Sequence, residues 1–177
     1  KPYLAYKLKL YPENKMKAKS MQLYLNALKD MPQQEIENYF KDMSKEMHNE
    51  LNFKVVDRLK KHLKEGDHVL LVSGAFTQML NEVTRDLAIH EVIGTQIPIK
   101  NGTVDTDNAI YHIQGERKNE KIEQALQGFD IDWENSSAYG DSISDITVLE
   151  LVGNPVAVRP ESRLQAIAEE RKWEILW

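Results

Sequence analysis

Two aspartates four residues apart, Asp141 and Asp145, have the type and spacing to bind a metal ion. They follow Gly140 and the stretch 136–139, so the pattern places them where a strand ends and a helix begins. Carboxylate oxygens suit Mg²⁺, which proteins usually hold with one or two carboxylates together with water and substrate phosphate. The alternative is that both aspartates only cap a helix. We favour the metal site, because capping alone does not require a glycine and two acids at one strand end.

A hydroxyl and a glycine, Ser73 and Gly74, follow the apolar run 68–72. Such a run is typical of a strand buried on both faces in a parallel sheet. At the end of that strand, the Ser73 hydroxyl and nearby backbone N–H groups could donate to an anion in front of the next helix. Taken alone, the pattern is better explained by Ser73 capping that helix.

A lysine, Lys118, lies at the predicted start of the helix 118–126. The position is electrostatically unfavourable, since a helix N-terminus already carries partial positive charge. It is explained if Lys118 faces carboxylates or phosphate, although a solvated lysine on a charged helix face is the simpler interpretation. Lys121, one turn further along, is a rival for the same role.

The sequence around these residues divides into two parts with different patterns of apolar residues. From 13 to 65 the apolar residues recur at helical spacing, with Pro32 placed to begin a helix and Gly66 placed to end one. From 67 onward strands alternate with helices, and Asn101 and Gly102 favour a hairpin turn. This order predicts an α/β fold with a doubly wound parallel sheet. The candidate boundary between the helical part and the alternating part lies at 51–53.

The order of Ser73, Lys118, Asp141 and Asp145 resembles the haloacid dehalogenase superfamily, and more narrowly its phosphoserine-phosphatase-like branch. The stretch 69–74, Val-Leu-Leu-Val-Ser-Gly, is similar to the second motif of the family. The stretch 140–145, Gly-Asp-Ser-Ile-Ser-Asp, is similar to the fourth and most specific motif, and 149–160 also reads like this branch.

The resemblance implies a Rossmann-like core over 53–177 with an inserted helical cap domain over 1–52. It also implies a Mg²⁺-dependent phosphatase that hydrolyses a small phosphate monoester through an aspartyl-phosphate intermediate. The roles that it implies are catalytic for Ser73, Lys118 and Asp145, phosphate-binding for Ser73, Gly74 and Lys118, and metal-binding for Asp141 and Asp145. Asp145 would act on the metal directly or through water or Lys118.

One family motif, an apolar strand ending in Asp-x-Asp before the cap, is not found in the sequence. Its first aspartate is the nucleophile of the family, and its strand lies between the strands ending at Ser73 and Tyr139. We therefore expect this segment upstream of Lys1. Two alternatives are a catalytically inactive relative that serves as a binding or regulatory module, and a receiver-like signalling domain, which the long helical segment and the 140–145 pattern oppose.

The amino-acid composition limits the kinds of partner and the kinds of chemistry that the chain can have. The 177 residues carry a formal net charge of -5, which argues against a nucleic-acid partner. There are 0 cysteines, which excludes disulfides, thiolate zinc sites and cysteine catalysis. No apolar run is long enough to span a bilayer, and the first residues do not resemble a secretory signal. We expect a cytoplasmic protein acting on a small phosphorylated metabolite, without a membrane or nucleic-acid partner. The sequence does not identify the substrate or the oligomeric state.

Overall fold

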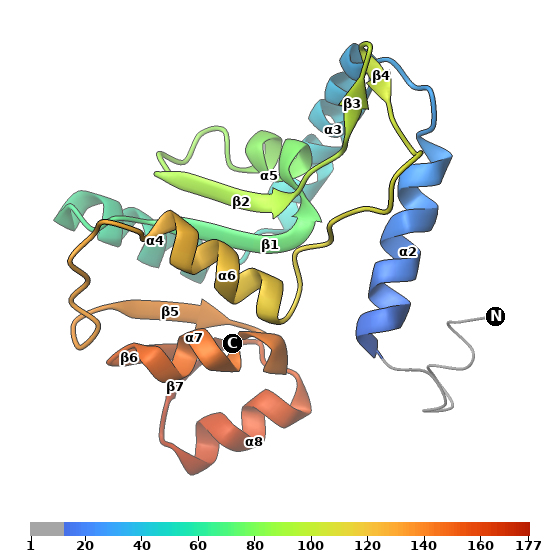
Figure 1. Cartoon of the computed structure of the whole chain (residues 1–177). Coiled ribbons are helices and arrows are strands. Elements are labelled where there is room, and N and C mark those ends of the chain that lie inside the picture. The colour runs from blue at the N-terminus through green and yellow to red at the C-terminus, as the bar shows by residue number, and fades with distance from the viewer. Residues whose placement is uncertain (1–12) are drawn as a thin grey trace. The chain divides into compact units, whose positions relative to one another are not determined.

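The computed structural model describes residues 13–177, which divide into two units (Figure 1). The described part of the first unit comprises 13–52 and Leu59–Gln114, and the second unit comprises Phe53–Arg58 and Gly115–Trp177. Residues 1–12, which the sequence places at the start of the cap domain, lie outside the described range. The assignment of 1–52 as a cap and 53–177 as the core remains a prediction.

The helical half of the first unit matches the apolar periodicity of the sequence. It contains α2 (Glu13–Ala27), α3 (Gln33–Met47), the 3₁₀ turn η1 (His48–Glu50) and α4 (Phe53–Glu65), whose first residues belong to the second unit. As predicted, α3 begins directly after Pro32, and Gly66 follows α4 with a φ of 88°. The largest buried cluster of the described residues joins α2 and α3 to the end of the first strand and to the segment 97–104. Its members are Leu25, Leu28, Ile36, Phe40, Phe76, Ile97 and Val104.

The strands of the first unit form a parallel pair and a hairpin. Strand β1 (Leu70–Phe76) pairs in parallel with β2 (Glu91–Thr95), and α5 (Thr77–Val83) connects them. Strands β3 (Ile99–Lys100) and β4 (Thr103–Val104) are antiparallel. Asn101 and Gly102 have φ values of 54° and 81°, so the predicted hairpin turn is confirmed with both residues in the left-handed conformation that such a turn requires.

The end of β1 differs from the sequence expectation. The strand does not stop before Ser73 but continues through Ser73 and Gly74 to Phe76, and α5 begins at Thr77. The expectation of burial on both faces was also wrong, because Phe76 is the fully buried residue of β1 and the others are half-buried. The pairing with β2 is irregular between Val72 and Phe76, so Ser73 lies in an irregular stretch of strand rather than in a strand-to-helix turn.

The second unit is a parallel sheet with helical connections. Its strands are β5 (Ser137–Gly140), β6 (Asn154–Val158) and β7 (Glu174–Leu176), in the order β5-β6-β7. Its helical elements are α6 (Glu116–Ala125), η2 (Ile143–Asp145), α7 (Ile146–Leu151) and α8 (Ser162–Glu170). Leu149, Ala157, Leu164 and Ala168 form its buried core. Parallel strands alternating with helices in both units confirm the predicted α/β class.

Within residues 13–177, each sheet ends in strands that are paired on one side only, and β1 and β5 are two of these edge strands. Strand β1 pairs with β2 on one edge only, and β5 pairs with β6 on one edge only. Each of these edges presents backbone N–H and C=O groups that a further strand could bind. The sequence expectation of a missing strand next to each of them is compatible with this pattern.

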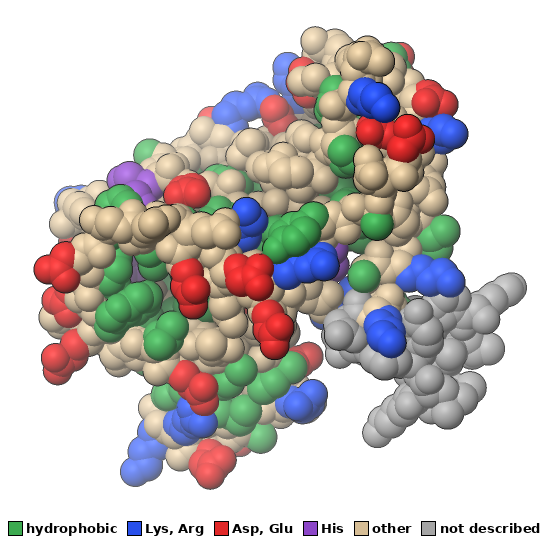
Figure 2. All heavy atoms as spheres, viewed as in Figure 1, with side chains coloured by type: hydrophobic (Ala, Val, Ile, Leu, Met, Phe, Trp, Pro, Cys, Tyr) green, Lys and Arg blue, Asp and Glu red, His purple; other side chains and the backbone are tan. Residues whose placement is uncertain are grey.

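The distribution of surface charge and the length of the helices can be compared with the expectation of no nucleic-acid and no membrane partner. On the face drawn in Figure 2, acidic and basic side chains are interspersed instead of being gathered into one basic area. Within 13–177, no helix combines the length and the apolar character needed to cross a membrane.

Candidate active site

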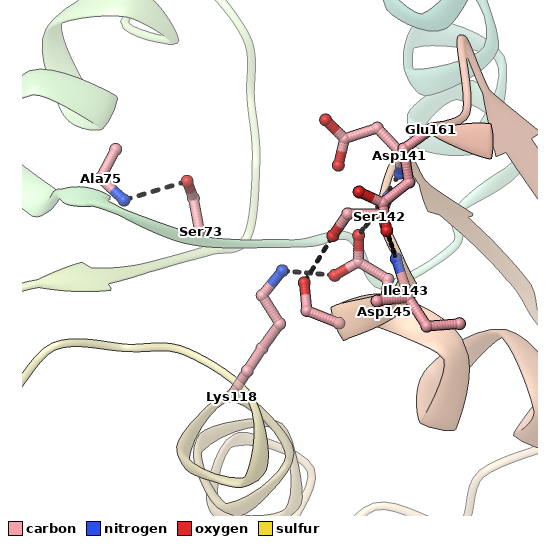
Figure 3. A network of polar contacts seen from close by, with 9 residues as sticks. Ser73, Ala75, Lys118, Asp141, Ser142, Ile143, Asp145 and Glu161 are labelled. Atoms are coloured by element: carbon pink, nitrogen blue, oxygen red, sulfur yellow. Dashed lines mark hydrogen bonds and ion pairs between the residues drawn. The ribbon is translucent and has the colours of Figure 1, made fainter. Parts of the chain in front are cut away.

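A largely buried ion pair joins two of the predicted site residues at the C-terminal end of β5 (Figure 3). Lys118 Nζ lies 2.6 Å from Asp145 Oδ1, and the two side chains are only 16% and 12% exposed. Lys118 comes from the first turn of α6, and Asp145 ends the 3₁₀ turn η2 that follows β5. A lysine at a helix start is favourable here because it faces a carboxylate across the second unit.

The second carboxylate oxygen of Asp145 points to the backbone of the loop that leaves β5. The N–H groups of Asp141 and Ser142 lie 3.3 and 3.4 Å from Asp145 Oδ2. In return, the Ser142 side chain accepts a hydrogen bond from the backbone N–H of Asp145, which completes a capping box. Both oxygens of Asp145 are therefore engaged, and a metal ion would have to compete with Lys118 for direct contact with this carboxylate.

Asp141 has a different environment. Its side chain is exposed, and its carboxylate takes part in no hydrogen bond or ion pair with the described residues. Its backbone is held from both sides, because its N–H points to Asp145 and its carbonyl accepts a hydrogen bond of 2.9 Å from Glu161 N–H. A fixed backbone that carries an open carboxylate is the donor chemistry that a hard divalent cation requires.

Glu161, which the sequence reasoning missed, supports the same loop. Its side-chain Oε1 accepts a hydrogen bond of 2.8 Å from Ile143 N–H, and its own N–H binds Asp141 as described above. The residue precedes α8, after β6, so it ties the loop after one strand to the loop after the neighbouring strand. The sequence shows an acidic residue before a helix at this position, but it does not show that the side chain binds Ile143, 18 residues earlier.

Gly140 is required by the position of Asp145. A Cβ atom at residue 140 would lie 2.7 Å from Asp145 Cβ, closer than real Cβ contacts, and 3.1 Å from its Oδ2, closer than most of them. The glycine of the 140–145 motif therefore makes room for the aspartate that binds Lys118.

Lys121, the other candidate for the role of Lys118, makes a different contact. Its Nζ donates to Gln124 Oε1 at 2.9 Å, within the exposed face of α6. The geometry therefore pairs Lys118, rather than Lys121, with the acidic loop.

The tyrosine beside the motif, Tyr139, is half-buried. Burial is the main cause that raises the pKa of its phenol above the ordinary value, and the nearby Arg58 guanidinium opposes this shift. Arg58 also forms an ion pair of 2.6 Å with Glu174 on β7. This phenol therefore stays neutral at ordinary pH and adds no charge to the loop.

Ser73 and Gly74 belong to the first unit. Ser73 Oγ accepts a hydrogen bond of 3.2 Å from Ala75 N–H (Figure 3), and α5 has no side-chain cap, so Ser73 does not cap a helix. The Gly74 carbonyl accepts a hydrogen bond of 2.8 Å from Thr95 Oγ1. Thus Lys118, Asp141 and Asp145 are brought together within the second unit, and Ser73 and Gly74 lie in the irregular stretch of β1.

A separate group of potential ligands lies at the end of α4. His62, Glu65 and Asp67 bring side-chain ligand atoms within 4.8 Å of one another, and His62 Nδ1 lies 2.7 Å from Asp67 Oδ2. Both acids are exposed, and Lys61 Nζ lies 3.8 Å from Glu65. We interpret the group as surface ion pairs at a helix C-terminus, where positive charge is favourable.

The sequence matches the profile of the haloacid dehalogenase-like hydrolase family over residues 2–150. The chain belongs to this family, so the predicted membership is confirmed.

Curated relatives agree with this assignment. A Streptomyces azureus protein named for inhibition of morphological differentiation is 30% identical over 120 residues, which cover 67% of this chain and 43% of that protein. A phosphoserine phosphatase of Mycobacterium tuberculosis is 30% identical over 116 residues, which cover 64% of this chain and 37% of that enzyme. The chain thus spans less than half the length of these two relatives.

Solved structures show the same fold. A Bordetella pertussis protein of unknown function matches with a TM-score of 0.82 at 22% identity, covering 99% of this chain and 78% of that one. A phosphoserine phosphatase in its apo form matches with a TM-score of 0.61 at 19% identity, covering 96% of this chain and 88% of that one. These similarities show that the chain shares the fold of these two proteins.

Proposed function

We propose that the protein containing this chain is a Mg²⁺-dependent phosphatase that hydrolyses a small phosphate monoester. The observation that carries the proposal is the loop after β5, where the open carboxylate of Asp141 lies beside the buried pair of Lys118 and Asp145. Family membership and the mycobacterial phosphoserine phosphatase support the same class of reaction.

The residues fit a magnesium ion. Asp141 supplies an oxygen ligand that no described residue occupies, on a backbone fixed by Glu161 and Asp145. When bound, the ion would neutralise charge on the phosphoryl oxygens and on the attacking carboxylate. Asp145 is better placed to position this loop and Lys118 than to bind the ion directly, because both of its oxygens are engaged.

The other residues of the chain would act on the phosphate. Lys118 would offset negative charge on the transferring group, and its pairing with Asp145 holds its ammonium group in one place. Ser73 would donate its hydroxyl proton to a phosphoryl oxygen, and Gly74 would donate its backbone N–H. Ser73 Oγ already accepts from Ala75, so its hydroxyl proton is left to donate.

The nucleophile would be an aspartate on a strand outside residues 1–177. The unpaired edge of β5 and that of β1 each offer a place for such a strand to pair. Attack on the monoester would form an aspartyl-phosphate and release the alcohol, and water would then free the phosphate. A phosphoserine phosphatase solved as a phospho-aspartyl intermediate analogue, with a TM-score of 0.61 to this chain, supports this route by its fold.

The proposal is tested by phosphate release from the natural full-length protein. We expect hydrolysis of small phosphomonoesters such as phosphoserine and an aryl phosphate, strict dependence on Mg²⁺, and loss of the activity in EDTA. Equal rates with Mg²⁺ and with EDTA would contradict the proposal. A folded full-length protein without turnover on any monoester would favour the alternative of an inactive binding or regulatory module.

A further inference from the structure

Thr95, the last residue of β2, connects two segments through one buried hydroxyl. Its side chain is 0% exposed. Its Oγ1 donates to the Gly74 carbonyl at 2.8 Å and accepts from Ile113 N–H at 3.1 Å. The hydroxyl proton and one lone pair are therefore both used, one on β1 and one on the segment that follows β4.

This contact lies where the backbone ladder between β1 and β2 is interrupted. Regular pairing runs up to Val72 with Ile93 and resumes at Phe76 with Thr95, so residues 73–75 face Gly94 alone. A Cβ at Gly94 would lie 2.8 Å from the Ala75 carbonyl oxygen, so the bulged stretch packs directly on this glycine. Bulges release backbone groups from the ladder and redirect side chains next to active sites.

The other face of the bulge is covered by the same segment that Thr95 binds. A Cβ at Gly74 would lie 2.9 Å from His112 Nε2 and 3.0 Å from the Ile113 carbonyl oxygen. His112 is itself buried, at 9% exposed. The residues at 112–113 therefore fit over a glycine, and Thr95 fixes them there through Ile113 N–H.

We propose that Thr95 is a positioning residue that holds the bulge at 73–75 in the shape that binds phosphate. The inference rests on the proposed function, in which Ser73 and Gly74 contact the phosphoryl oxygens. The ladder does not fix this stretch, so the Thr95 hydroxyl provides the link that the backbone of β2 lacks. Its removal leaves the half-buried carbonyl of Gly74 and the buried N–H of Ile113 without their partner.

The experiment compares Thr95→Val with Thr95→Ser in the natural full-length protein. Valine has the shape of threonine without the hydroxyl, and serine restores the hydroxyl. We expect Thr95→Val to weaken competitive inhibition by inorganic phosphate about tenfold, the effect of roughly one hydrogen bond, and Thr95→Ser to recover most of it. We also expect the amide hydrogens of Gly74 and Ala75 to exchange about tenfold faster in Thr95→Val.

Thr84→Val is the matched control. Thr84 Oγ1 also donates to a backbone carbonyl, that of Leu80 at 2.8 Å, and is half-buried in the same unit. This variant loses an equivalent bond at the end of α5, away from the bulge, so phosphate inhibition should not change. The proposal is overturned if Thr95→Val binds phosphate and exchanges its amides as the unmodified protein does, or if Thr84→Val shifts both equally.

Failure of the two proposals can be told apart. A full-length protein without turnover or phosphate inhibition would remove the proposed function. Amide exchange at residues 73–75 would still decide on Thr95, because faster exchange in Thr95→Val that serine restores supports the positioning role. Unchanged exchange would reject it.

Discussion

Replacing Asp141 with asparagine is expected to lower kcat/KM for phosphomonoester hydrolysis by at least about a hundredfold while the protein remains folded. The side chain is exposed and its carboxylate has no partner among the described residues, so its loss removes little native structure. Asparagine keeps the shape but removes the charge that a divalent cation needs. The measurement is phosphate release at saturating Mg²⁺, with the melting temperature as the test of folding.

Asp130→Asn is the control for this variant. Asp130 is also an exposed aspartate of the second unit, but it precedes β5 instead of following it. We expect Asp130→Asn to keep its turnover. Near-normal turnover in Asp141→Asn would refute the metal-binding role of Asp141.

Replacing Lys118 with methionine is expected to destabilise the protein by about 3 kcal/mol and to abolish turnover. The two side chains are 16% and 12% exposed, so the change leaves the Asp145 carboxylate buried without its counter-charge. Methionine keeps much of the length and apolar stem of lysine. The free energy of unfolding is measured by urea denaturation of the variant and the unmodified protein.

Two further variants test whether the loss of stability comes from the ion pair of Lys118 with Asp145. Lys121→Met changes an exposed contact with Gln124, and we expect less than about 0.5 kcal/mol. Combining Lys118→Met with Asp145→Asn should recover part of the lost stability, because the buried charge is then absent. A loss in Lys121→Met as large as that in Lys118→Met would contradict the assignment of the ion pair.

The elements that rest on local signals could be predicted from the sequence. Apolar periodicity located the helices before Gly66, and Asn101 with Gly102 located the hairpin. The 140–145 motif located the loop after β5, because its glycine and aspartates are consecutive in the chain. Local chemistry also raised the suspicion about Lys118, since a lysine in the first turn of a helix needs an acidic partner.

The features that depend on distant partners could not be predicted. Ser73 was expected to follow the strand, but the strand continues to Phe76 as a bulge that packs on Gly94 and is bound by Thr95, 21 residues away from Gly74. Glu161 supports the acidic loop through Ile143, and no spacing rule connects these two residues. The choice between Lys118 and Lys121 required the rotation of α6 relative to β5, which the pattern of the helix does not fix.

The central claim is that the loop after β5 holds the divalent cation, and Mn²⁺ as a paramagnetic probe tests it most directly. In amide spectra of the natural full-length protein, we expect Mn²⁺ to broaden the signals of residues 140–143 first, and Mg²⁺ to reverse the effect. Asp141→Asn should abolish this broadening. Broadening centred on His62, Glu65 and Asp67, with the signals of 140–143 unchanged, would contradict the account.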